Sequence, residues 1–97
     1  MVRIVRLSFR PEHTEDFTAL FEARKFKIRA VAGCTHLELW RDQALSNVFY
    51  TYSHWAHPDD LENYRVSEFF KDTWQTIKPW FNAPAQAFST DVMQTLP

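Results

Sequence analysis

The chain has 97 residues, a length at which one domain can bury a core without disulfides or metals. Its 11 basic and 12 acidic residues nearly cancel, which argues against binding along a nucleic-acid backbone. Apolar residues make up 45% and charged residues 24%, a globular balance, while the aromatic share reaches 16%. We expect one domain over residues 1–97, with aromatic side chains that fill its core or lie against a partner.

Cysteine content and hydropathy bear on the compartment. Cys34 is the only cysteine, so no disulfide can form within the chain, and a lone thiol is usually a small buried hydrophobe. No stretch approaches the roughly 18 apolar residues of a membrane span, and the first residues are strand-like, without a signal-peptide core. We therefore expect a cytoplasmic protein with neither a membrane nor a nucleic-acid partner.

The first third of the chain predicts a strand followed by a helix. Residues 2–9 alternate with period 2, the pattern of a half-buried strand. Thr14 can cap a helix over residues 14–31, which has acidic residues in its first turn and basic residues in its second half. Gly33 then supplies the stop.

The middle of the chain predicts a hairpin of two alternating strands, residues 34–41 and 48–55, joined by the polar segment DQALSN. Together with the first strand they form two different faces. The face that must meet the helices carries Val5, Leu7, Phe9, Leu37, Leu39 and Phe49. The opposite face carries Arg6, His36, Glu38, Trp40, Tyr50, Tyr52 and His54. This second face is too aromatic for open solvent and too polar for a dry core.

The last third predicts two helices and a strand. Pro58 suits the first position of a short helix that is broken near Ser67, and Ser67 can cap the next helix. Apolar positions of that helix follow the spacing i, i+4, i+7, i+11 at Phe70, Trp74, Ile77 and Phe81. A final strand is predicted over residues 86–94. The order β-α-β-β-α-β indicates an α+β, ferredoxin-like fold with helices on one side of a four-stranded antiparallel sheet.

Several segments resemble the antibiotic biosynthesis monooxygenase family: the AGC turn into THLELWRD, the aromatic strand that ends at Trp55, and HPDDLENYRVSEFFKDTWQTIKPWF. Similar members have a Trp at the end of the third strand, a short acidic helix, and then a Ser before an aromatic-rich helix. The resemblance implies a dimeric α+β barrel. It also implies one of several activities, because the family includes cofactor-free quinone-forming monooxygenases, haem-degrading enzymes and relatives of unknown activity.

The haem-degrading members differ from this chain at three positions. They carry an Asn on the first strand, a Trp on the short helix and an iron-binding His on the long helix, where this sequence has Val5, Tyr64 and Trp74. Without that imidazole the usual proximal ligand is absent. Tyr64 also replaces a short-helix His of other members, so we expect no haem and no transferred His-dependent mechanism.

Other cofactors find no support in the sequence. His36, His54 and His57 do not form a compact set of recognised metal-ligand spacing. The single glycine excludes a Gly-rich phosphate-binding loop. We expect neither a metal nor a nucleotide cofactor.

The amphipathic face predicts a partner. A second sheet laid on it would bury the rings and let the polar tips pair across a two-fold axis, so we expect a homodimer through the face that bears Trp40, Tyr50 and Tyr52. Two interpretations of the interface remain open. It holds a site between subunits with His36 and His54, or it is a packed interface without chemistry.

A cleft is predicted between the sheet and the helices. On its sheet side lie Thr51, Ser53 and Trp55, and on its helix side lie Tyr64 and Trp74. In a cofactor-free oxygenase Tyr64 can donate to a developing oxyanion, and Trp55 can offer its N–H or a stacking face. The base is missing, unless a one-residue register slip moves His36 or His54 across the sheet, which makes His36 the third catalytic candidate. The ligand-binding candidates are Thr51, Ser53 and Trp74. The alternative is that these aromatic rings only fill the core.

Two functions follow from these expectations. The first, by family resemblance, is a cofactor-independent monooxygenase that acts on a small aromatic or polyketide-like substrate. The alternative is a non-catalytic dimeric domain that binds a small molecule or only its own copy. A base beside Tyr64 would favour the enzyme, and a filled apolar interior would favour the structural alternative.

Overall fold

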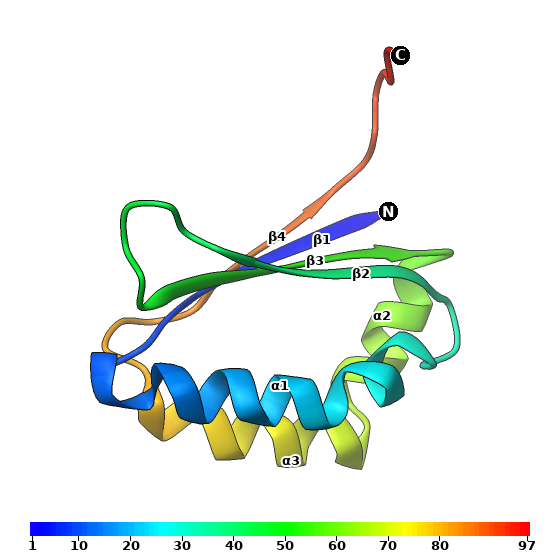
Figure 1. Ribbon diagram of the computed structural model, residues 1–97. Coiled ribbons are helices and arrows are strands. Elements are labelled where there is room, and N and C mark those ends of the chain that lie inside the picture. Colours follow the sequence, from blue (N-terminus) through cyan, green and yellow to red (C-terminus); the bar gives the residue numbers. More distant parts are fainter.

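The computed structural model describes residues 1–97, and its elements follow the predicted β-α-β-β-α-β order (Figure 1). The strands are β1 (Val2–Ser8), β2 (Cys34–Arg41), β3 (Val48–Trp55) and β4 (Gln86–Thr90). The helices are α1 (Thr14–Arg29), α2 (Pro58–Arg65) and α3 (Glu68–Ile77), with short 3-10 turns η1 (Pro11–His13) and η2 (Lys78–Trp80). None of these helices combines the length and the hydropathy that crossing a membrane requires.

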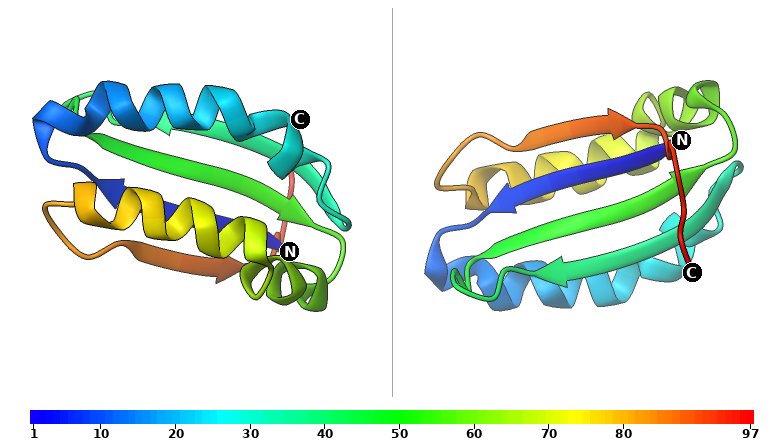
Figure 2. Two further views of the ribbon diagram at one scale, coloured as in Figure 1. Left: turned by 90° about the horizontal axis from the view of Figure 1, so that it is seen from below. Right: turned by 90° about the horizontal axis from the view of Figure 1, so that it is seen from above.

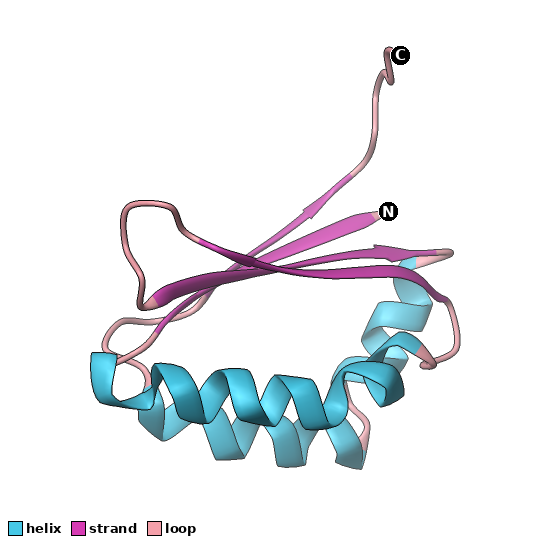
Figure 3. Cartoon of the chain, in the orientation of Figure 1, coloured by secondary structure: helices cyan, strands magenta, loops and turns pink.

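The four strands form one antiparallel sheet in the order β2-β3-β1-β4. Helices α1 and α3 run side by side under one face of the sheet. At one end of the molecule, α2 lies between the sheet and these two helices (Figures 1 and 3). Seen from above, the other face of the sheet carries no helix (Figure 2). The fold is therefore the ferredoxin-like α+β arrangement that the sequence predicts.

Strand register decides which residues share a face. Arg3 lies opposite Ser53 of β3 on one side and Ser89 of β4 on the other. Val5 lies in the next row of that face, opposite Thr51 and Ala87. Because cross-strand partners point to the same side of a sheet, these rows all face the helices.

The core fills one end of the space between the sheet and the helices. Its central members are Leu7, Phe9, Phe17, Phe49 and Ile77. Phe9 is fully buried and its ring stacks on that of Phe17, with the centroids 4.4 Å apart. Burial of each such side chain stabilises the fold by roughly 1.5–3 kcal/mol, so this cluster anchors both long helices to the sheet. A smaller cluster of Cys34, Trp55 and Leu61 lies at the other end, where α2 packs against the sheet.

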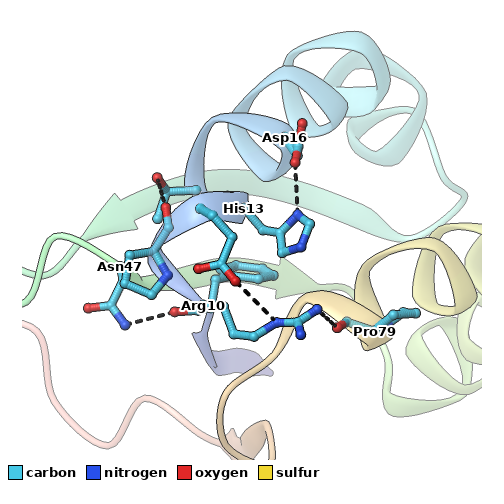
Figure 4. A network of polar contacts seen from close by, with 9 residues as sticks. Arg10, His13, Asp16, Asn47 and Pro79 are labelled. Atoms are coloured by element: carbon cyan, nitrogen blue, oxygen red, sulfur yellow. Dashed lines mark hydrogen bonds and ion pairs between the residues drawn. The ribbon is translucent and has the colours of Figure 1, made fainter.

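A polar network closes the core end of the molecule (Figure 4). Arg10 donates from Nη2 to the carbonyl of Pro79 at 2.6 Å, and Asn47 donates from Nδ2 to the carbonyl of Phe9 at 2.8 Å. His13 contacts Asp16 at 2.8 Å. These bonds connect the end of β1 to η2 and to the β2–β3 loop, and they give polar partners to backbone groups near the core.

The structure corrects three boundaries. Thr14 does not cap α1: its hydroxyl donates to the carbonyl of Pro11, because the preceding 3-10 turn already leads into the helix. Helix α1 ends at Arg29 rather than at residue 31. The expected periodicity up to Phe81 breaks after Ile77, since η2 follows and Phe81 bridges to Phe9.

Strand β4 is also shorter than the predicted span of residues 86–94. Thr90 pairs with Val2, the first residue of β1, so residues beyond Thr90 have no strand to pair with. They leave the sheet on the side opposite the helices (Figure 1).

Candidate functional site

A pocket of about 360 Å³ lies between the sheet and the helices, next to the packed core. Fifteen of its 20 lining residues are apolar. The predicted residues Thr51, Ser53, Trp55, Tyr64 and Trp74 all line it. The structure thus brings together five of the six candidates on one cavity, which has the size and the lining of a small-molecule site.

A hydrogen bond joins the side chains of Trp55 and Ser53. Trp55 donates from Nε1 to Ser53 Oγ at 3.0 Å, and both side chains are buried. The indole N–H is therefore occupied, and Trp55 can offer a ligand only its ring. Ser53 Oγ acts as the acceptor in this bond, so its own O–H can donate to a ligand.

Tyr64 is the polar group best placed to act on a ligand. Its ring stacks on Trp55 with centroids 5.5 Å apart, while the hydrogen bonds it receives go to its backbone carbonyl. The side-chain hydroxyl is thus free to bind. Burial, followed by the nearby Cys34 thiol, raises the pKa of Tyr64 to about 12. At neutral pH Tyr64 therefore stays protonated and serves as a hydrogen-bond donor, not as a base.

Helix α3 supplies the rest of the aromatic wall. Phe70 and Trp74 stack with their planes 10° apart and their centroids 5.9 Å apart. Tyr64 meets Phe70 edge to face at 5.1 Å. Because both α3 rings are only partly buried and both line the pocket, they are not simply core residues. Flat walls of this kind suit a flat ligand.

His36 lies elsewhere. It pairs with His54 across β2 and β3 on the open face of the sheet, and its Nε2 contacts Glu38. A register shift between Cys34 and His36 does not bring the imidazole to the helix side. The pocket lining contains no histidine and no carboxylate, so the structure separates His36 from the other candidates and supplies no general base in their place.

Two cations were not among the predicted site residues. Arg3 of β1 and Arg65 of α2 both line the pocket. Arg3 alternates with Val5 and Leu7, so the period-2 pattern did indicate its face. The orientation of Arg65 depends on how α2 docks, and no local pattern signals it.

The open face forms its own polar network. Trp40 donates from Nε1 to Glu38 at 2.9 Å, and this bond together with the one to His36 lowers the pKa of Glu38. Tyr52 and His54 share a hydrogen bond at 2.6 Å, and Trp40 stacks on Tyr52 at 4.7 Å. Nowhere in the chain do three or more His, Cys, Asp or Glu side chains gather as a metal site would require.

Residues 1–76 match the family described as antibiotic biosynthesis monooxygenase. The chain belongs to this family. The match covers the sheet up to β3 and nearly all of α3, including each pocket residue named above as a candidate. No curated protein sequence matches the chain.

Solved structures support the fold of this family member. A crystal structure described as an antibiotic biosynthesis monooxygenase is 18% identical, covers 97% of this chain and 100% of its own, and has a TM-score of 0.87. Rv0793 of Mycobacterium tuberculosis is 18% identical over 96% of this chain and 97% of its own, with a TM-score of 0.83. A conserved protein of Methanosarcina mazei Go1 is 15% identical over 90% and 87%, with a TM-score of 0.83. At these identities the likeness concerns the fold.

Proposed function

We propose that the protein is a cofactor-independent monooxygenase that binds a small, flat aromatic or polyketide-like substrate in the pocket between sheet and helices. The observation that carries the proposal is the aromatic cavity of about 360 Å³ beside a Tyr64 hydroxyl that has no partner within the chain. Membership in the antibiotic biosynthesis monooxygenase family supports the reaction class.

The proposed reaction converts a phenol to a quinone. The substrate phenol gives its proton to bulk solvent before it binds, because the pocket lining offers no histidine or carboxylate. The resulting anion supplies four electrons to O₂: one oxygen atom forms a new C=O bond on the ring, and the other leaves as water with the two displaced hydrogens. Tyr64 donates to the developing oxyanion, and the rings of Trp55 and Trp74 hold the substrate and exclude water.

We also propose that the protein is a homodimer through the open face of the sheet. Trp40 on this face is 36% exposed in the single chain, and Phe88 on β4, the opposite edge strand, is 53% exposed. Residues beyond β4 extend past the same side and include the exposed Val92 and Met93 (Figure 1). A second copy would cover these apolar groups and would match the barrel arrangement that the family resemblance implies.

One observation favours a second function. The missing base is compatible with a domain that binds the same flat ligand without transforming it, and the fold alone does not separate the two. The test is to add a panel of flat phenols and quinols to the purified protein and to follow melting temperature and oxygen uptake together. Stabilisation with oxygen uptake supports the monooxygenase, and stabilisation alone supports the binding domain.

Two variants locate the reaction in the pocket. Tyr64→Phe should lower turnover about a hundredfold, since removal of one oxyanion donor costs on that order or more, and should leave the melting temperature nearly unchanged. Thr51→Phe should fill the cavity and block binding. Thr76→Val removes one hydroxyl from α3 outside the pocket and is the control. Equal losses in Tyr64→Phe and Thr76→Val would contradict the pocket as the site.

A further inference from the structure

Arg3 and Arg65 are the only charged residues that line the pocket. Both also line a second, mainly polar hollow of about 280 Å³, as does Leu61. Residues shared by two hollows lie between them. Arg3 of β1 and Arg65 of α2 therefore stand at the boundary between the aromatic cavity and the polar hollow, and they give the cavity its only charged end.

Arg3 has no carboxylate partner. Its Nη1 donates to Ser89 Oγ at 2.9 Å, and its cross-strand neighbours are the hydroxyl residues Ser53 and Ser89. Arg3 is half-buried, and this burial followed by the charge of Arg65 lowers its pKa, while the charge of Glu62 opposes the shift without reversing it. A partly desolvated cation beside a like charge is unfavourable unless an anion joins it.

Arg65 retains donors for an additional anion. Its Nη1 pairs with Glu62 Oε2 at 3.1 Å, an exposed contact within one turn of α2. A guanidinium carries five N–H donors, so a single contact leaves most of them free. Glu62 and Asp91, like Ser89, line only the second hollow, so the present partners of both guanidinium groups lie on that side and the aromatic pocket itself has no carboxylate.

From this arrangement we infer that the ligand of the pocket is an aromatic carboxylic acid, with its ring between Trp55, Tyr64 and Trp74 and its carboxylate held by Arg3 and Arg65. The inference rests on the proposed function in one respect, namely that the pocket binds a ligand. Planar guanidinium groups match the two oxygens of a carboxylate, and the anion relieves the repulsion between the two cations.

The test compares two ligands that share a ring system and differ in charge: 2-naphthoate and its neutral amide, 2-naphthamide. Binding at neutral pH is measured by calorimetry and by quenching of the total tryptophan fluorescence, to which the pocket residues Trp55 and Trp74 contribute. The proteins are the full chain, Arg3→Gln, Arg65→Gln and Arg3→Lys. Lys71→Gln is the matched control, because it removes one positive charge from the exposed surface of α3, outside the pocket.

We expect the unaltered chain to bind the acid about tenfold more tightly than the amide, as one charge-assisted hydrogen-bond pair allows. Arg3→Gln and Arg65→Gln should each weaken the acid severalfold and leave the amide within about twofold. Arg3→Lys should retain part of the preference, and Lys71→Gln all of it. If one Gln variant fails to fold, the other variant tests the same preference.

Three outcomes would overturn the inference. Equal binding of acid and amide by the unaltered chain would exclude a preference for an anionic ligand but would still support a ligand-binding pocket. Equal weakening of both ligands in the Gln variants would make the arginines packing residues. Binding of neither ligand would overturn the inference and the pocket proposal together.

Discussion

The two faces of the sheet both carry aromatic and polar side chains, but they satisfy the polar groups in different ways. On the open face Trp40 and His36 both bond Glu38, and Tyr52 bonds His54. On the helix-facing side Tyr64 lines a cavity, and its hydroxyl has no hydrogen-bond partner within the chain. The guanidinium of Arg3 on that side has a single hydroxyl partner.

This difference in hydrogen bonding supports a different proposed binding partner for each face. A network whose polar groups bond one another forms a surface that another protein chain can cover without losing hydrogen bonds. Unsatisfied donors around a cavity are costly until a ligand accepts their bonds. The open face is thus suited to a second copy of the chain, and the helix-facing side is suited to a small molecule.

The largest expected effect concerns the open face. Trp40→Glu places a charge among Glu38 and Tyr52 and should weaken dimerisation by about 3 kcal/mol, more than a hundredfold, giving a monomer or insoluble protein. Gln75→Glu adds the same charge on exposed α3 and should leave assembly unchanged. Analytical ultracentrifugation measures both. A dimer of unaltered affinity in Trp40→Glu would exclude this face as the interface.

The next effect concerns the helix-facing side and pH. Because the pKa of Tyr64 is raised to about 12, the folded chain keeps a proton that the unfolded chain loses near pH 10. The stability that comes from the neutral hydroxyl is complete below pH 10 and is lost as the pH rises towards 12, by on the order of 2 kcal/mol. Denaturant unfolding over this pH range should show the loss in the unaltered chain and not in Tyr64→Phe. Equal pH dependence in both would show that Tyr64 ionises as in water.

The smallest expected effect separates the faces directly. His36→Gln removes the imidazole from the open face, so turnover in the pocket should change by less than about twofold when the protein is assayed as a dimer. His54→Gln is a companion variant at the paired position. A tenfold or larger loss of turnover in either variant would indicate that the base lies on the open face, in a site between subunits.

The alternation of side chains made much of the fold predictable. Period-2 patterns placed β1, β2 and β3 and separated their faces, and Pro58 and Ser67 marked the starts of α2 and α3. The same alternation placed Thr51, Ser53 and Trp55 on one side of the sheet. The end of β4 was not predictable from its own residues. It is set by the position of Val2, the first residue of β1, which pairs with Thr90.

For the site, the sequence by itself determined which side chains were available and which sheet face carried them, since both follow from local periodicity. Only the tertiary structure decided that a cavity remains between them, that the indole N–H of Trp55 is occupied by Ser53, and that Arg3 and Arg65 line the same cavity. Those features depend on how closely α2 and α3 approach the sheet. That distance is a property of packing between residues far apart in the chain, which no local pattern encodes.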